Sequence, residues 1–229
     1  MTPRIGYLIG SHVAYQHNAL PHLLNSILPQ IERDRIVIVV NGSAETREYQ
    51  DGYNGLHWCF ATQEAASHFN PIADHKWRSR GFTHWFYLNC TSWVGPDFRQ
   101  LVESGFDPNA HATLAGGLLP IPRSGRGKQG RAINDLAMYR DDYLFSMRGE
   151  IAKMTDWRCD DGVFEWEGLL YALAPKQAHY PSLGHAVMGM HDLYNTGTMR
   201  IIEYYPGIDL FRAKSNWGQI NPARKKTGA

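Results

Sequence analysis

The sequence contains few cysteines, no long apolar run and no excess of charge of either sign. Its three cysteines lie far apart and form no Cys-x-x-Cys pair, which argues against a disulfide framework or a zinc site and favours free thiols in a reducing compartment. No apolar run approaches the ~20 residues that span a bilayer. No basic-then-apolar signal precedes the first apolar stretch. We therefore expect a soluble, cytoplasmic protein without a membrane partner.

The net charge and the length of the chain further restrict the possible functions and the number of domains. Lys and Arg total 23 against 22 Asp and Glu, so bulk charge does not favour non-specific binding to nucleic acid, although a local patch remains open. With 229 residues, 43% of them hydrophobic, the chain can bury one sizeable core. We find no internal repeat and no linker, so residues 1–229 are expected to form a single domain. Beyond Pro175 the pattern is irregular, apart from a strand predicted over 199–204.

Apolar, β-favouring runs alternate with helical patterns in the first half of the sequence. Residues 5–9 form an apolar run, Asn18 can cap a helix that continues to Leu28, and residues 35–40 supply the continuous β-branched run IVIVV. This order predicts a right-handed strand–helix–strand unit. Residues 85–88 show no polar alternation, as expected of a strand covered on both faces. The sequence therefore predicts an α/β fold with a mainly parallel, twisted sheet flanked by helices.

Small polar residues follow three of the predicted strands. The first strand ends in Gly10-Ser11-His12, the second in Asn41-Gly42-Ser43, and the run 85–88 is followed by Asn89-Cys90-Thr91. In open α/β sheets, ligands bind outside the carboxyl ends of the strands, so these three ends predict one shared ligand site. Ordinary turn chemistry is the alternative, because Asn, Gly and Ser are common turn residues.

The segment HWFYLNCTSWVGPDFRQL, residues 84–101, joins a strand, a polar corner and a helix that begins near Asp97. It resembles a segment of the GT-A-type nucleotide-sugar glycosyltransferases, which usually carry Asp-x-Asp at the corner to hold a metal and the sugar diphosphate. Here Asn89 and Thr91 stand at those positions. The resemblance implies a single GT-A-like, Rossmann-like domain. Its expected parts are a donor-nucleotide half over about 1–100, an acceptor half over about 101–210 and a basic tail over 211–229.

The resemblance also implies a donor and the residues around it. The donor is a nucleotide diphosphate sugar, with Ser11, His12 and Asn41 around the nucleoside. Asn89 and Thr91 are expected near the diphosphate.

The corner raises the question of a metal. Mn²⁺ and Mg²⁺ prefer anionic oxygen ligands, whereas Asn89 and Thr91 offer only neutral ones. Either the protein works without a metal, or the metal is held by Asp97 or by a C-terminal group such as His191 or Asp192. We single out His191, because GT-A-type enzymes often bring a C-terminal histidine onto the metal or the diphosphate.

A basic, glycine-rich segment, PRSGRGKQGR, covers residues 122–131. Glycines let backbone amides approach a phosphate, and cations supply the charge that a missing metal would have given. Arg126, Lys128 and Arg131 are therefore donor-binding candidates. The same segment suits contacts with a nucleic-acid backbone, and a solvated surface loop is an equally weighted alternative.

An acidic helix start, CDDGVFEWEG, covers residues 159–168. Inverting GT-A-type enzymes carry an acidic residue near the start of a comparable helix, where it deprotonates the acceptor hydroxyl. By that resemblance Asp161 or Glu165 is the catalytic base. Helix capping is the competing explanation for one of the aspartates.

These observations together predict a hexosyl- or pentosyl-type glycosyltransferase that transfers a sugar to a hydroxyl acceptor. A base of modified DNA is one candidate acceptor, and a small molecule or a protein fits at least as well. The alternative from another class is a non-catalytic nucleotide- or carbohydrate-binding module on the same fold. The missing Asp-x-Asp favours the binding module, and the acidic helix start favours the enzyme.

Overall fold

The computed structural model describes most of the chain between residues 2 and 215. The described residues are 2–15, 17–42, 53, 55–61, 68–73, 80–116, 118–119, 131–132, 136–153, 170–171, 173–182, 184–194 and 199–215.

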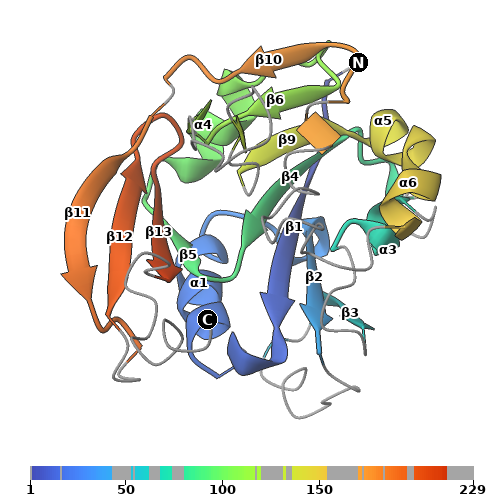
Figure 1. The fold of residues 1–229 in the computed structure, drawn as a ribbon. Coiled ribbons are helices and arrows are strands. Elements are labelled where there is room, and N and C mark those ends of the chain that lie inside the picture. Colours follow the sequence, from blue (N-terminus) through green and yellow to red (C-terminus); the bar gives the residue numbers. More distant parts are fainter. Residues whose placement is uncertain are drawn as a thin grey trace, which may run out of the picture.

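The main sheet has seven strands in the order β10-β6-β9-β4-β1-β2-β3. The central neighbours β4, β1, β2 and β3 run parallel, as do β6 and β10, while β9 runs antiparallel to both β4 and β6. The predicted α/β class with a mainly parallel sheet is therefore confirmed (Figure 1). The strands are β1 (Ile5–His12), β2 (Ile36–Asn41), β3 (His57–Ala61), β4 (His84–Asn89), β6 (Ala112–Leu114), β9 (Ala137–Arg140) and β10 (Gln177–His179).

Both faces of the central strands are covered, as their continuous apolar runs predict. Every residue of β2 is buried, and so are the first five residues of β4. The helices α1 (Ala19–Ile27) and α4 (Phe98–Gly105) pack on one face of the sheet. The short helices α3 (Asn70–Ala73), α5 (Asp141–Ser146) and α6 (Arg148–Lys153) pack on the other. The result is a layer of helices on each side of the sheet (Figure 1).

The start of α1 follows the sequence prediction. The Asn18 side chain accepts a hydrogen bond from the Ala19 N–H, so Asn18 caps the helix. The apolar face of α1, formed by Leu20, Leu23 and Leu24, is fully buried against the sheet. This burial fixes the strand–helix–strand unit that places the ends of β1 and β2 side by side.

A second, antiparallel sheet extends from the end of β4. Its order is β11-β12-β13-β5, and β5 begins three residues after β4 ends (Figure 1). Residues 211–215, which the sequence analysis assigned to a basic tail, belong instead to β13, where side chains such as Ala213 are buried. The strands are β5 (Ser92–Val94), β11 (Ala186–His191), β12 (Arg200–Tyr205) and β13 (Leu210–Ser215).

The remaining described elements are small. A two-stranded sheet joins β7 (Leu118–Leu119) to β8 (Arg131–Ala132), and 3-10 helices cover Val13–Tyr15 and Arg33–Arg35. Cys59 and Cys90 are free cysteines, as predicted. Among the described residues, no helix is both long and apolar enough to cross a membrane.

Candidate functional site

The carboxyl ends of β1, β2 and β4 form one polar edge of the main sheet. In the parallel register His12 is level with Asn41, and Gly10 is level with Asn89. Because side chains alternate along a strand, Gly10, His12, Asn41, Tyr87 and Asn89 all lie on the same face of the sheet. The structure thus brings together the strand ends that the sequence analysis selected. We call this group the polar edge.

His12 and Asn41 occupy the part of the polar edge formed by β1 and β2. The His12 ring packs against Gly42, since a Cβ atom at Gly42 would lie 2.6 Å from His12 Nε2. Gly42 also has a φ of +77°, a conformation that favours glycine. Asn41 is buried, and so is Ser11 on the opposite face. The close approach of His12 therefore depends on a glycine at position 42.

His68 lies over the end of β1 and links it to β4. Its Nε2 is 3.2 Å from the Ser11 carbonyl oxygen and its Nδ1 is 2.9 Å from the Tyr87 hydroxyl. A carbonyl can only accept, so Nε2 donates to Ser11 and the Tyr87 O–H donates to Nδ1. Burial lowers the pKa of His68 to about 4. The ring is therefore neutral at pH 7 and acts as a structural link between the two strands.

Gly10 makes room for this link. A Cβ atom at Gly10 would lie 2.5 Å from His68 Nδ1 and 2.6 Å from the Tyr87 hydroxyl oxygen. Both distances are far shorter than ordinary van der Waals contact, so a larger residue at position 10 displaces the pair.

The side chains at the corner after β4 are hydrogen-bonded to one another. The Asn89 side-chain oxygen Oδ1 accepts hydrogen bonds from Thr91 Oγ1 at 2.7 Å and from Ser92 Oγ at 3.4 Å. Cys90 is buried, and its N–H donates to the Gly10 carbonyl oxygen at 2.8 Å. Burial also raises the pKa of the Cys90 thiol to about 11. The two positions that correspond to Asp-x-Asp are thus bonded to each other.

This corner does not fit a divalent cation. Mn²⁺ and Mg²⁺ require several oxygen ligands, preferably anionic, whereas Asn89 and Thr91 are neutral and Asn89 Oδ1 already accepts from two hydroxyls. Within the described part of the chain, no cluster of three or more His, Cys, Asp or Glu side chains is arranged to hold a metal ion.

His191 lies far from the corner, and Asp97 takes part in a helix start. His191 ends β11, the strand of the second sheet farthest from β5, and its side chain is exposed. With strands about 4.8 Å apart, three strand spacings place β11 roughly 14 Å from β5. Asp97 is exposed at the start of α4, and its N–H donates to the Asp209 carboxylate at 2.9 Å. Asp209, from the turn between β12 and β13, therefore caps this helix in place of Asp97.

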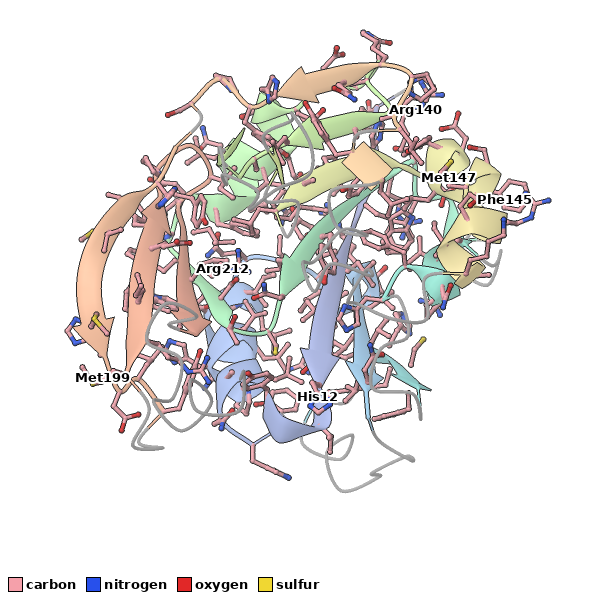
Figure 2. The ribbon with its side chains drawn as sticks, viewed as in Figure 1. His12, Arg140, Phe145, Met147, Met199 and Arg212 are labelled. Carbon is pink, nitrogen blue, oxygen red and sulfur yellow. The ribbon has the colours of Figure 1, made fainter. Side chains whose placement is uncertain are left out.

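The second sheet contributes a buried arginine beside the polar edge. Arg212 on β13 is level with Ser92 on β5, and 9% of its surface is exposed. Residues level with each other in an antiparallel pair point to the same face, so Arg212 shares a face with the Ser92 hydroxyl that reaches Asn89. Figure 2 shows Arg212 between the second sheet and β4. Burial lowers the pKa of Arg212 to about 10, and the nearby Tyr87 acts in the opposite direction.

Arg200 on β12 is also buried, but its place differs from that of Arg212. In the register Arg200 and Arg212 lie on opposite faces of the second sheet. The Arg200 guanidinium lies over the rings of Tyr15 and Tyr194, at 5.5 Å and 5.3 Å from their centroids. This arrangement is a cation–π packing contact away from the face that carries His12 and Asn41.

Several sequence candidates are not placed by the structure. Asp161, Glu165, Arg126 and Lys128 lie outside the described residues. Arg131 belongs to β8, but its side chain is not described. The roles of these residues remain predictions.

The sequence analysis missed His68, Tyr87 and Arg212. Gly10, next to Ser11, was the one local signal of a close approach at the end of β1. Arg212 stands between apolar residues in LFRA, a pattern that indicates a strand but not which face meets the polar edge. Pairing between β13 and β5 decides that, and it joins distant parts of the chain.

Comparisons with known proteins give likenesses at the level of the chain trace. No protein-family model matches this chain, and no curated protein matches it. Similar solved structures include the mannose-1-phosphate geranyltransferase from Thermus thermophilus, with 11% identity and a TM-score of 0.49 over 80% of this chain and 74% of that one. TarS from S. aureus in complex with UDP-GlcNAc shows 10% identity and a TM-score of 0.49 over 86% of this chain and 62% of that one.

A third similar structure is the mannosyltransferase PcManGT from Pyrobaculum calidifontis in complex with GDP-Man and Mn²⁺. It shows 14% identity and a TM-score of 0.48 over 80% of this chain and 57% of that one. The chain thus spans less than two thirds of the solved TarS and PcManGT chains. Because the identities are 10–14% and the TM-scores lie below 0.5, these likenesses carry no argument here, and the α/β class rests on this chain's own sheet topology.

Proposed function

We propose that this protein is a glycosyltransferase that moves a sugar from a nucleotide diphosphate sugar to a hydroxyl group. The observation that carries the proposal is the polar edge. The ends of three adjacent parallel strands place His12, Asn41 and Asn89 on one face, at the position where open α/β sheets bind nucleotides. Neutral amide and imidazole groups suit the hydrogen-bonding edges of a base and a ribose.

The proposed reaction needs a base beside the sugar. The acceptor hydroxyl oxygen attacks the anomeric carbon, the bond from that carbon to the diphosphate breaks, and the nucleoside diphosphate leaves with the bonding electrons. Asp161 or Glu165 takes the hydroxyl proton if the reaction inverts the anomeric centre. His12 and Asn41 are proposed to contact the nucleoside, whereas the Ser11 side chain is buried on the opposite face of the sheet and does not fit the role expected for it. Arg126, Lys128 and Arg131 are proposed to offset the charge of the leaving group.

For the acceptor and the sugar we propose only the chemical class. A hexosyl or pentosyl donor fits equally, and the acceptor is a small molecule, a protein or a base in modified DNA. We place the donor half at about 1–100 and the acceptor half at about 101–210 of one domain, and we propose that the protein acts in the cytoplasm.

A second candidate function has one observation in its favour. The Asn89 oxygen is occupied by the Thr91 and Ser92 hydroxyls, so the corner is a closed, neutral structure. Such a corner suits a nucleotide- or carbohydrate-binding module that performs no transfer. Removal of the catalytic base, Asp161 or Glu165, distinguishes the two functions, because a binding module needs no proton acceptor.

A ligand screen tests the shared part of both functions. Nucleoside diphosphates and their sugars are added to the full chain with and without Mn²⁺, and the melting temperature is followed. A ligand at 100 times its Kd stabilises the folded state by about 2.7 kcal/mol, which corresponds to a shift of roughly 5–10 °C for a chain of this size. No shift with any nucleotide or nucleotide sugar contradicts both the glycosyltransferase and the nucleotide-binding module.

The enzyme is then tested with the best donor. Release of the nucleoside diphosphate is followed in the wild type and in the Asp161→Asn and Glu165→Gln variants, with Asp142→Asn as a surface control. We expect one of the first two changes to lower kcat by at least 100-fold while donor affinity stays within about threefold. Donor binding without any turnover across an acceptor panel supports the binding module instead.

A further inference from the structure

The outer edge of the second sheet is formed by β11, whose side chains are apolar and exposed. Within the described part of the chain β11 pairs only with β12, and Figure 1 shows it as the outermost strand of its sheet. Met199, which directly precedes β12, lies at the same margin of the molecule (Figure 2). Most of the large apolar side chains that the described residues expose belong to this edge: Val187 (65% exposed), Met188 (56%), Met190 (36%) and Met199 (48%).

Such an edge favours pairing with a further strand. An edge strand presents a row of backbone N–H and C=O groups, and proteins usually protect it with charged residues, proline or a bulge. Residues 186–191, AVMGMH, include no Asp, Glu, Lys, Arg or Pro. The protection that β11 does have is a bulge near Met188, where the pairing with β12 shifts by one residue. The edge therefore combines apolar side chains with the backbone groups of an edge strand.

The bulge makes β11 complementary to a second copy of itself. On β12, Glu203 is level with Val187 and Ile201 is level with Met190, so Val187 and Met190 point to the same face of the sheet. Two β11 strands related by a twofold axis can then pair with Val187 of one copy level with Met190 of the other, both on one face. Without the bulge these positions, three residues apart, would point to opposite faces and this register would not form.

The same register suits the other positions along the strand. Met188 of one copy is level with Gly189 of the other, which has no side chain to obstruct it. Beyond the strand ends, His185 is level with Asp192, so a basic group and an acidic group flank the apolar centre. No two like charges oppose each other along the pair, and the strand therefore meets no electrostatic penalty when it pairs with itself.

The size of the edge sets the strength of such a pair. Six residues at about 3.4 Å each make a strand roughly 20 Å long, in a sheet that is about 10 Å thick with its side chains. Pairing then buries roughly a few hundred Å² per copy, which is at the low end for specific interfaces, below about 1,200 Å² in total. An edge of this size fits a second copy that binds reversibly in the micromolar range, and it does not fit a permanent dimer.

We propose that β11 is a dimerisation edge, at which two copies of this chain pair in antiparallel orientation. Pairing joins their two four-stranded second sheets into one continuous sheet. The dimer is reversible and forms as the protein concentration rises. It is independent of the proposed function, because β11 and the polar edge belong to different sheets.

Sedimentation velocity of the full chain at about 1–200 µM tests the dimer, and the wild type should pass from monomer towards dimer over this range. Val187→Lys and Met190→Glu each place a charge opposite an apolar side chain, so each should weaken dimerisation by roughly 10-fold or more. Leu173→Lys is the matched control, because Leu173 is also a large apolar side chain that is 48% exposed, but it lies outside the second sheet. Its dimerisation should stay within about twofold of the wild type.

A mixture of the two charged variants tests the register. Where a Val187→Lys copy pairs with a Met190→Glu copy, opposite charges are level on one side of the axis. The other side keeps the wild-type pair of Val187 and Met190. The equimolar mixture should therefore dimerise at least roughly 5-fold more tightly than either variant alone.

The inference is overturned if the wild type stays monomeric up to about 200 µM. It is also overturned if both charged variants dimerise as the wild type does, or if Leu173→Lys weakens the dimer as much as they do. A mixture that binds no better than the separate variants contradicts the paired strands. If a charged variant does not fold, hydrogen exchange in the wild type decides the question. The amides of residues 186–191 should then exchange more slowly at high than at low protein concentration, and equal exchange rules the pairing out.

Discussion

The close approach of His68 to β1 can be tested by filling the space above Gly10. In Gly10→Ala the new methyl group would lie 2.5 Å from His68 Nδ1 and 2.6 Å from the Tyr87 hydroxyl oxygen. His68 is partly buried and held at both ring nitrogens, so it cannot move aside without losing its bonds to Ser11 and Tyr87. The strain should therefore appear as lost stability.

The magnitude follows from two contributions. Overpacking a well-packed site costs about 1–3 kcal/mol, and each neutral hydrogen bond that is broken costs about 0.5–1.5 kcal/mol. We expect Gly10→Ala to lower the free energy of unfolding by about 2–4 kcal/mol. Gly149→Ala is the control, because Gly149 lies in α6 with no atom within 4 Å of the added Cβ. That change should be neutral or stabilise by up to about 1 kcal/mol, as alanine favours helices.

Urea unfolding followed by tryptophan fluorescence measures both changes, with the slope against denaturant unchanged. A comparison in a variant background that lacks both clashing groups isolates the cause. When His68→Ala and Tyr87→Phe remove the two clashing groups, adding Gly10→Ala should cost less than about 1 kcal/mol. A Gly10→Ala variant within about 0.5 kcal/mol of the wild type would refute the packing argument.

Three further predictions concern buried groups. The pKa of His68 is lowered to about 4 in the folded state against 6.5 for an ordinary histidine, so only the unfolded chain takes up a proton between these values. Stability from this group is therefore complete above pH 6.5 and falls by about 3 kcal/mol on going down to pH 4, and His68→Gln should flatten this part of the stability curve. The buried Asp141 carboxylate accepts from Trp85 Nε1 at 2.9 Å, so Asp141→Ala should cost about 2 kcal/mol in denaturant unfolding while the exposed Asp142→Ala costs less than about 0.5. In a variant that keeps Cys90 as its sole cysteine, a thiol reagent at pH 8 should react at least 100-fold more slowly with the native than with the unfolded protein. The reason is that burial raises the pKa of the Cys90 thiol to about 11. Equal reaction rates would contradict the burial of Cys90.

The central strands could be predicted because the residues within each strand already indicate that both of its faces are buried. The β-branched run of β2 and the apolar run of β4 are both buried on both faces, as continuous apolar strands should be. Their polar ends could be predicted to meet for the same reason, since parallel strands align their carboxyl ends at one edge. Only part of the second sheet could be predicted. The strand expected over 199–204 corresponds to β12, but the sheet also depends on the pairing of β13 with β5, which joins segments far apart in the sequence. The side chains of β11 are mostly exposed, so that strand shows no clear apolar period.

The corner after β4 escapes a search for acidic motifs, because it carries no carboxylate of its own. Asn89 keeps the shape of an aspartate without its charge, and its oxygen accepts from Thr91 and Ser92. The nearest charged side chains of the second sheet are those of Arg212, which is level with Ser92 on β5, and of Glu203, which is level with Arg212 on β12. Both are buried, and both belong to strands that join the corner only in the folded chain, so the sequence alone does not place these charges.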